Sequence, residues 1–233
     1  MKSLYRKMKI LLKVLLGKEI NYKNQLNLPM KWYGHNSAGF FVYEDKLSAK
    51  SIVYSIGVGE DISFDRELIK RFGCTVYGFD PTPKSIEFIK KQSGLTNYIF
   101  NSYGLYNKDG FIEFYLPEDD KYVSGASFNR WNYNTQVIKP IQVPVKKFSS
   151  MVAEMGHNRI DVLKMDIEGA EYDVIDDILS SDVKIDQILI EFHHRFSGIG
   201  INKTIDCINK LNAAGYKIAK VSESREEYSF LKN

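Results

Sequence analysis

The feature that most constrains the fold of this chain is an apolar run that ends abruptly at two carboxylates. Residues 162–172 read VLKMDIEGAEY, in which Asp166 and Glu168 follow the apolar run. A run of this kind that stops at a glycine turn predicts a buried strand. Ligands of open α/β sheets bind outside the carboxyl ends of the strands. We therefore expect Asp166 to face a functional site, whereas Glu168 could equally cap the next helix, whose N-terminus favours negative charge.

Segments typical of strands alternate with helical segments along most of the chain. Strand-like runs cover residues 51–56, 75–79, 98–100, 104–106, 111–115, 141–145, 162–165, 187–190, 216–221 and 228–231. Helical stripes of apolar residues cover 62–72, 82–91, 149–155, 172–179 and 205–211. We expect 104–106 and 111–115 to form a hairpin-like pair, the proline-containing run at 141–145 to be an edge strand, and the last two strands to pair. The alternation predicts an α/β fold, with a mostly parallel sheet and helices on both faces.

Composition narrows the class of protein. The chain has 233 residues, of which 44% are hydrophobic and 26% charged, which is typical of one globular domain and excludes a disordered or multi-span membrane chain. A net charge of +3 is too small to argue for a nucleic-acid partner. Cys74 and Cys207 show neither metal-ligand spacing nor a disulfide framework, so we expect a reducing, cytoplasmic setting.

The first 20 residues predict a basic amphipathic helix. Apolar and basic residues recur there at helical spacing: Leu4, Met8, Leu11, Leu12, Leu15 and Leu16 among Lys2, Arg6, Lys7, Lys9, Lys13 and Lys18. Lys13 interrupts the apolar run, so the segment is too short to span a bilayer, and no small-residue cleavage site follows it. The helix could lie on an anionic membrane surface, or it could pack on the domain or on a neighbouring subunit.

Two further segments lie outside the regular alternation. Residues 21–50 form an aromatic lead-in, with a short strand or hairpin that could lie over a site, and the α/β domain then covers residues 51–233. The stretch from residue 117 to 140 has no clean periodicity. It could be a substrate-facing loop or a surface insertion.

The run at 51–56 ends at a glycine turn that suits a nucleotide-like ligand. Gly57 and Gly59 permit a tight turn and let a ligand approach the backbone, and the helix that follows offers unpaired N–H groups. Asp80 ends the next strand, about 20 residues further on, where a nucleotide-binding α/β domain places an acid that binds the ribose hydroxyls. Thr82 already fills the role of helix cap, which favours the ligand-binding interpretation of Asp80.

Polar residues also follow the other predicted strands. Asn101 follows the third strand, and Glu191 and His193 follow the strand at 187–190. Together with the glycine turn, Asp80, Asp166 and Glu168, they are expected to meet at one edge of the sheet. Four segments that carry these residues resemble the FkbM-type methyltransferases, a branch of the class I S-adenosylmethionine-dependent methyltransferases: 53–61 (VYSIGVGED), 76–83 (VYGFDPTP), 163–171 (LKMDIEGAE) and 190–194 (IEFHH).

The resemblance implies a Rossmann-like class I methyltransferase sandwich over residues 51–233, with a seven-stranded sheet and S-adenosylmethionine as the cofactor. It places Gly57 and Gly59 under the methionine part of the cofactor and Asp80 at its ribose. Two further residues, Asn101 and Ser102, are expected near the adenine. Many class I enzymes have an acid where this chain has Ser55, so Glu60 or Asp61 is expected to take over contacts to the amino group of the cofactor.

The resemblance also implies methyl transfer to a hydroxyl group on a sugar, a glycan or a related small metabolite. Such a transfer is an in-line displacement in which the protein aligns the acceptor and manages its proton. The candidate catalytic residues are Asp166, Glu191, His193 and His194. Adjacent residues of an extended strand point to opposite sides, so we expect only one of the two histidines to face the site. Alternatively, Asp166, Glu168, Glu191 and His193 could hold Mg²⁺ or Mn²⁺.

Two other classes of protein share some of these features. An NAD-dependent Rossmann oxidoreductase would also have the glycine turn and Asp80, but its third glycine is absent, because position 62 is isoleucine. A non-catalytic scaffold with the same fold could instead be recruited to a membrane or a partner by the N-terminal helix. The sequence identifies neither the acceptor nor the oligomeric state.

Overall fold

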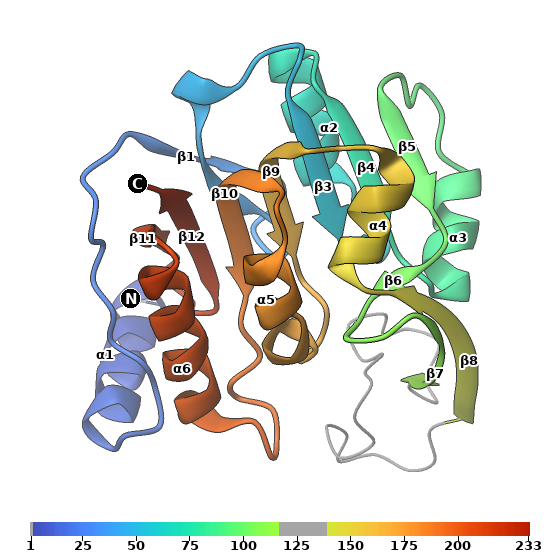
Figure 1. The fold of residues 1–233 in the computed structure, drawn as a ribbon. Coiled ribbons are helices and arrows are strands. Elements are labelled where there is room, and N and C mark those ends of the chain that lie inside the picture. The colour runs from blue at the N-terminus through green and yellow to red at the C-terminus, as the bar shows by residue number, and fades with distance from the viewer. Residues whose placement is uncertain (1, 117–138) are drawn as a thin grey trace.

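The computed structural model describes residues 2–116 and 139–233. Its centre is a seven-stranded sheet in the order β11-β12-β10-β9-β3-β4-β5 (Figure 1). Its strands are β3 (Ile52–Ile56), β4 (Thr75–Phe79), β5 (Tyr98–Asn101), β9 (Arg159–Met165), β10 (Lys184–Glu191), β11 (Tyr216–Val221) and β12 (Glu227–Lys232). All run parallel except β12, which is antiparallel to both of its neighbours. The mostly parallel seven-stranded sheet is therefore confirmed.

The order of the strands reverses between β3 and β9. From β3 the chain moves outward through β4 to β5, and it later returns to place β9 on the other side of β3, followed by β10. The carboxyl ends of the neighbouring strands β3, β4 and β9 consequently lie side by side. The loops that follow these three strands therefore meet at one edge, which is where open α/β sheets bind ligands.

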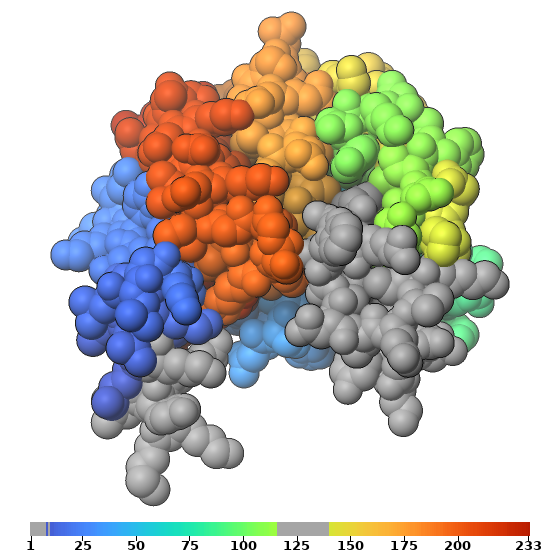
Figure 2. Space-filling view, turned by 90° about the horizontal axis from the view of Figure 1, so that it is seen from below, coloured from blue at the N-terminus to red at the C-terminus, as the bar shows by residue number. Residues whose placement is uncertain are grey.

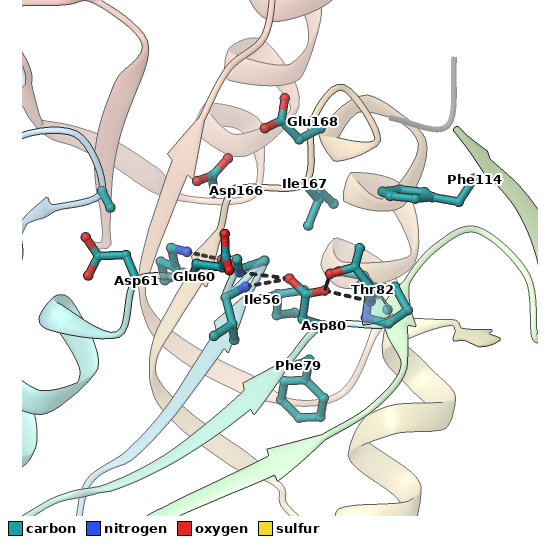
Figure 3. A pocket seen from close by; sticks show the side chains of 18 of the residues that line it. Ile56, Glu60, Asp61, Phe79, Asp80, Thr82, Phe114, Asp166, Ile167 and Glu168 are labelled. Atoms are coloured by element: carbon teal, nitrogen blue, oxygen red, sulfur yellow. Dashed lines mark hydrogen bonds between the residues drawn. The ribbon is translucent and has the colours of Figure 1, made fainter. Parts of the chain in front are cut away.

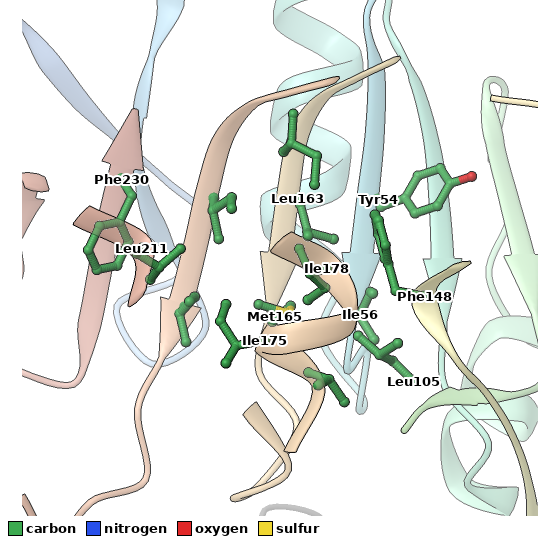
Figure 4. Packing of buried hydrophobic residues seen from close by; sticks show 14 of the residues in the cluster. Tyr54, Ile56, Leu105, Phe148, Leu163, Met165, Ile175, Ile178, Leu211 and Phe230 are labelled. Carbon is green, nitrogen blue, oxygen red and sulfur yellow. The ribbon is translucent and has the colours of Figure 1, made fainter. Parts of the chain in front are cut away.

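One face of the sheet is covered by α4 (Phe148–Met155), α5 (Glu171–Ser180) and α6 (Gly200–Ala213). Figure 4 shows the apolar layer between these helices and the sheet. Its fully buried members include Tyr54, Ile56, Leu163 and Met165 from the strands and Phe148 and Leu211 from the helices. Burying an apolar side chain of this size stabilises the fold by roughly 1.5–3 kcal/mol.

The opposite face is covered by helices and by a hairpin. Helices α2 (Ser63–Phe72) and α3 (Pro83–Lys90) lie on the side of β3 to β5, and their apolar residues join Val53 and Val76 in a second core cluster. The antiparallel strands β1 (Met30–Tyr33) and β2 (Phe40–Tyr43), followed by the short 3-10 helix η1 (Glu44–Lys46), cover the side of β10 and β12. The predicted lead-in at 21–50 thus forms a hairpin that packs on the sheet.

Side-chain to backbone hydrogen bonds fix this hairpin to the sheet. The Gln187 side chain exchanges two bonds with the backbone of Tyr43, at 2.9 and 3.0 Å, and Ser229 Oγ donates to the carbonyl oxygen of Phe41 at 2.7 Å. Gln187 and Ser229 are both buried. Their polar groups therefore find partners in the hairpin, which buried polar groups require.

A separate three-stranded sheet corrects two of the sequence predictions. It has the order β6-β8-β7, with β6 (Gly104–Leu105), β7 (Gly110–Leu116) and β8 (Lys139–Lys146). The hairpin-like pairing of 104–106 with 111–115 is wrong, because β8 lies between them. The expected edge strand at 141–145 is the middle strand, although β6 pairs only with its last two residues. The prolines of β8 fall outside that short pairing, which explains why they are tolerated.

The N-terminal segment forms α1 (Lys2–Leu15). Gly17, two residues beyond the end of this helix, has a backbone φ of +64°. Among the described residues, no helix is both long and apolar enough to cross a membrane. The predicted substrate-facing loop at 117–140 lies almost entirely outside the residues that the structure describes.

Candidate functional site

The glycine turn after β3 and the acidic turn after β9 lie in close contact. Gly57 has a backbone φ of +82°, and a Cβ atom there would lie 1.7 Å from the carbonyl oxygen of Asp166. Such a position accepts only glycine. Gly59 also has a positive φ, +55°, but no described atom lies within 4 Å of where its Cβ would be. The turn is therefore packed against β9 at Gly57 and leaves open space at Gly59.

A cavity of about 420 Å³ lies at this edge of the sheet (Figure 3). Seven predicted site residues line it: Gly57, Gly59, Glu60, Asp61, Asp80, Asp166 and Glu168. Its apolar lining consists largely of Ile56, Phe79, Leu105, Phe114 and Ile167, and the loop between β1 and β2 contributes Ser37 and Ala38. An apolar cavity of this size with a few convergent polar groups is typical of a small-molecule site.

Asp80 connects two segments of the cavity wall. One carboxylate oxygen accepts hydrogen bonds from the backbone N–H groups of Val58 and Gly59, at 3.0 and 2.9 Å. The other accepts from the backbone N–H and the hydroxyl of Thr82, at 2.8 and 2.6 Å. Thr82 also caps α3, as predicted, by accepting a bond from Ser85. Asp80 therefore holds the glycine turn in place in addition to lining the cavity (Figure 3).

Asp61 and Glu60 lie at the end of the glycine turn. Asp61 accepts a hydrogen bond from the backbone N–H of Ser63 at 2.7 Å, so it supports the start of α2, and its other oxygen lies 2.8 Å from Nδ1 of His35. Burial alone would raise the pKa of Asp61, but the bonds from Ser63 and His35 lower it below its usual range. Asp61 is thus a carboxylate at the rim of the cavity, and two of its acceptor positions are already used.

A second group of titratable residues adjoins the cavity, and we call it the acid–histidine cluster: Asp166, Glu168, Glu171, Glu191 and His193. His193 is at its centre and is buried. Its Nδ1 lies 2.8 Å from Glu171, and its Nε2 lies 3.4 Å from Glu168 and 3.7 Å from Asp166. Asp166 and Glu168 also line the cavity, so the cluster meets the cavity through these two carboxylates.

The charges in this cluster strongly perturb one another. Burial by itself would lower the pKa of His193, but the carboxylates of Glu171, Glu168 and Asp166 outweigh it and hold that pKa well above its usual range. Burial, together with the charges of Asp166 and Glu171, raises the pKa of Glu168 to about 8. Burial and the charge of Asp166 raise the pKa of Glu191 to about 9. The cluster therefore favours the cationic form of His193 and the protonated forms of Glu168 and Glu191.

Part of the cluster has the donor set of a cation site. One ligand atom each from Asp166, Glu191 and His193 lies within 4.8 Å of the others. Two carboxylates and one imidazole suit Mn²⁺ or Mg²⁺, which the sequence left open as an alternative for these three residues together with Glu168. Nothing in the relatives described below bears on a metal ion.

Three predicted site residues belong neither to the cavity lining nor to the acid–histidine cluster. Asn101 and Ser102 do not line the cavity, because β5 is the outermost strand, three positions away from β9. The Asn101 amide instead lies within hydrogen-bond distance of the Gly78 and Ile99 carbonyl oxygens. His194 points away from His193, and its Nε2 lies 2.7 Å from a carboxylate oxygen of Glu19. Of the two histidines, His193 belongs to the acid–histidine cluster and His194 contacts Glu19.

Two residues of the site had no predicted role. Lys164 is buried, lines the cavity and donates a 2.5 Å hydrogen bond to the carbonyl oxygen of Gly57. Glu171 is fully buried, and one of its oxygens accepts from the backbone N–H groups of Ile167 and Gly169 as well as from His193. Both belong to the 163–171 motif. Charged residues are almost never fully buried without a partner, so a lysine inside the apolar run was the available signal.

The structure has partial likenesses to solved structures at low sequence identity. It matches the fibrillarin pre-rRNA processing protein of Methanococcus jannaschii with a TM-score of 0.48 and 11% identity, covering 79% of this chain and 67% of that one. It matches Aeropyrum pernix fibrillarin, solved with natively bound S-adenosyl-L-methionine, with a TM-score of 0.44 and 8% identity, covering 92% and 85%.

Sequence comparison identifies the family. The chain is 27% identical over 152 residues to proteins named "Probable methyltransferase-like protein 24" from Homo sapiens and Rattus norvegicus. The match covers 64% of this chain and 34% and 35% of the relatives, so the chain spans about a third of their length. The family model described as the methyltransferase FkbM domain matches residues 52–218, which is more than half of the chain. The chain therefore belongs to the FkbM methyltransferase domain family.

Proposed function

We propose that this protein transfers a methyl group from S-adenosylmethionine to a hydroxyl group of a sugar, a glycan or a related small metabolite. One observation supports the choice of a hydroxyl acceptor. Asp166 lines the cavity beside the glycine turn, and it also contacts His193 of the acid–histidine cluster. A hydroxyl acceptor must lose a proton as it is methylated, and a positioned carboxylate can take that proton.

The cavity residues fit S-adenosylmethionine. The open side of Gly59 gives a ligand access to the backbone. Glu60 and Asp61 supply carboxylates for an ammonium group at one end, and Asp80 and Thr82 supply partners for ribose hydroxyls. The apolar lining suits an adenine ring and a thioether chain. Because Asp80 already accepts four protein hydrogen bonds, ribose hydroxyls would replace those from Thr82, while the bonds to Val58 and Gly59 keep the turn in place.

Three features of the cluster favour Asp166 as the proton acceptor. Asp166 lines the cavity and its side chain is 25% exposed, whereas His193 is buried behind it. One oxygen of Glu171 is occupied by three N–H donors. Burial and the neighbouring charges raise the pKa of Glu168 and of Glu191, which favours their protonated forms. Among the members of the cluster, this leaves Asp166 as the group that can take a proton from the acceptor.

In the proposed reaction, the other residues position Asp166 and the acceptor. When bound, S-adenosylmethionine supplies a methyl group that is already activated by a sulfonium. The close contact between Gly57 and the Asp166 carbonyl holds the glycine turn against the acidic turn. Lys164 also holds the glycine turn, through its hydrogen bond to the Gly57 carbonyl oxygen. His193 stays bonded to Glu171, and its Nε2 lies 3.7 Å from Asp166. Asp166 would accept the hydroxyl proton when the acceptor oxygen takes the methyl group and the neutral thioether is released.

The proposal predicts opposite effects for two isosteric substitutions. Asp80→Asn should weaken the binding of S-adenosylhomocysteine by at least about tenfold, because an amide cannot accept the same set of hydrogen bonds. Asp166→Asn should leave that binding within about twofold, and it should lower turnover by a factor of about 10²–10⁴, which is the usual contribution of a general base. Binding is measured by calorimetric titration and turnover by methyl transfer to a panel of hydroxylated sugars.

The controls separate this proposal from its alternatives. Tight NAD binding without S-adenosylhomocysteine binding would favour the oxidoreductase. Binding of S-adenosylhomocysteine without transfer to any hydroxylated acceptor would favour the scaffold. If Asp166, Glu191 and His193 hold a divalent ion, a chelator removes turnover and manganese or magnesium restores it, in which case Asp166 acts as a ligand. The reverse pattern of the two substitutions would overturn the assigned roles.

A further inference from the structure

Helix α1 exposes its apolar face to solvent. Met8, Leu11, Leu12, Leu15 and Leu16 are each 57–75% exposed. Among the described residues, only Ile99 and Phe111 are other large hydrophobic side chains with comparable exposure. Residues 8, 11, 12 and 15 follow the i, i+3, i+4, i+7 pattern, so they form one continuous stripe. We call this stripe, together with Leu16, the leucine face. A contiguous exposed apolar patch marks an interaction surface.

The leucine face is not the side by which α1 contacts the domain. Ile10 and Val14 are half-buried, whereas Leu11 and Leu15, which follow them in the chain, are exposed. Ile10 and Val14 therefore lie on the more covered side of α1, and the leucine face lies on its exposed side.

The segment that carries the leucine face is strongly basic. Residues 1–18 contain six lysines and arginines and no aspartate or glutamate. An apolar face on a helix of this composition suits the interface of an anionic bilayer, where the apolar side chains enter the headgroup region and the cations attract lipid phosphates. A second copy of the same helix is a poorer partner, because the cations of the two copies would repel one another.

The segment that follows α1 is bonded to the domain. Just beyond the end of α1, the fully buried Glu19 side chain accepts hydrogen bonds from Arg195, at 3.0 and 2.6 Å, and lies 2.7 Å from His194. Arg225 donates to the carbonyl oxygen of Ile20 at 3.3 Å. His194 is the neighbour of His193 in the acid–histidine cluster. The base of α1 is therefore tied to the segment that carries a site residue.

This position places the leucine face on the same side of the molecule as the site. In Figure 1, α1 lies at the end of the sheet toward which the parallel strands point. Figure 2, which views that end, shows the last part of α1 and the residues after it in dark blue, beside the orange segment that follows β10. Helix α1 thus lies at the end of the sheet at which the cavity is found.

We propose that α1 docks the protein on the surface of an anionic phospholipid bilayer through the leucine face. The docking does not depend on the proposed methyl transfer, because it uses none of the cavity residues. Anionic lipid supplies both complements that the segment needs, an apolar layer for the leucines and negative charge for the lysines. The protein binds at the interface and does not span the membrane.

Vesicle sedimentation tests this proposal. The full-length wild-type protein should sediment with vesicles of phosphatidylcholine that contain about a third phosphatidylserine, and binding to pure phosphatidylcholine should be at least about tenfold weaker. High salt should weaken the binding further. The double substitution Leu12→Glu with Leu15→Glu should reduce binding to the anionic vesicles at least about tenfold. A matched control is Phe111→Glu, which changes an equally exposed apolar residue on β7 and should leave binding unchanged.

Measurements without lipid complete the test. The thermal midpoint and the binding of S-adenosylhomocysteine should be the same in the double variant as in the wild type, since the changed residues are exposed. Three outcomes would overturn the proposal: wild-type protein that stays in the supernatant, equal losses for the double variant and Phe111→Glu, or a lipid-free dimer that the double variant dissociates without losing vesicle binding. The last outcome would assign the leucine face to self-association.

Discussion

Glu168 occupies the turn between β9 and α5 with a backbone φ of +53°, in the left-handed region that favours glycine. Asn97 and Arg225 also have positive φ values, but they do not line the cavity, whereas Glu168 does. A residue with a Cβ atom pays about 1–2 kcal/mol for this conformation. Residues in such unfavourable backbone conformations cluster at functional sites, where the function requires their side chain at that position. The sequence left open whether Glu168 caps a helix, and its position at the cavity favours a role in the site.

This strain predicts the relative stability of two substitutions at position 168. Both Glu168→Gly and Glu168→Ala remove the carboxylate, but only alanine keeps the Cβ atom. We expect the free energy of unfolding of Glu168→Gly to exceed that of Glu168→Ala by about 1 kcal/mol, as measured by urea denaturation. Glu87 in α3 is the control, because it is exposed and helical, and there alanine should be the more stable by about 1 kcal/mol. Equal stabilities at position 168 would contradict the left-handed turn.

At the scale of elements, the contact between Glu19 and the end of β10 connects α1 to the domain. Arg195 pairs with Glu226 as well as with Glu19, so one cation serves two acids from distant parts of the chain. The arrangement is a buried network in which removal of one partner leaves another charge without compensation. Such a loss costs about 3–5 kcal/mol, whereas an exposed ion pair contributes about 0–1 kcal/mol.

Glu19→Gln should therefore lower the free energy of unfolding by about 3 kcal/mol. Glu87→Gln is a matched control, since the ion pair of Glu87 with Lys90 is exposed on α3, and we expect a change below about 0.5 kcal/mol. Chemical denaturation at neutral pH measures both values. Similar small changes in the two variants would show that the Glu19 network does not hold α1 against the domain.

The same network predicts how stability depends on pH. Burial would raise the pKa of Glu19, but the hydrogen bonds from His194, Arg195 and the backbone of Ile20 lower it from 4.5 to about 2. Because the pKa is lower in the folded state, the stabilisation is complete above about pH 4.5 and is lost as the pH falls from there toward 2. Between these values, the wild type should lose more stability than Glu19→Gln. Parallel curves for the two proteins would contradict the lowered pKa.

At the scale of the whole molecule, the central sheet could be predicted because each of its strands is a distinct apolar run followed by a helix or a turn. The partners of β8 could not be predicted, because alternation in residues 141–145 shows that a strand forms but not which strands lie beside it. For the site, likewise, the sequence showed which residues end strands but not which of these strands lie side by side. Gly57, Asp80 and Asp166 end strands at the centre of the sheet, where the strand order reverses, whereas Asn101 ends an outer strand. The position of a strand within the sheet was not visible in the sequence.

Ligand binding to the central edge should stabilise the entire domain, because the cavity joins turns from β3, β4 and β9 that are separated in the unfolded chain. At a concentration of 100 times its Kd, S-adenosylhomocysteine should contribute about 2.7 kcal/mol to the free energy of unfolding. For a chain of this length, about 1 kcal/mol raises the thermal midpoint by 2–4 °C, so we expect a rise of about 5–10 °C in calorimetry. NAD at the same concentration should produce no comparable rise. In Asp80→Asn, the rise at a fixed concentration of S-adenosylhomocysteine should shrink in proportion to the logarithm of the lost affinity, which ties the stabilisation to this cavity; an undiminished rise would place the ligand elsewhere on the molecule.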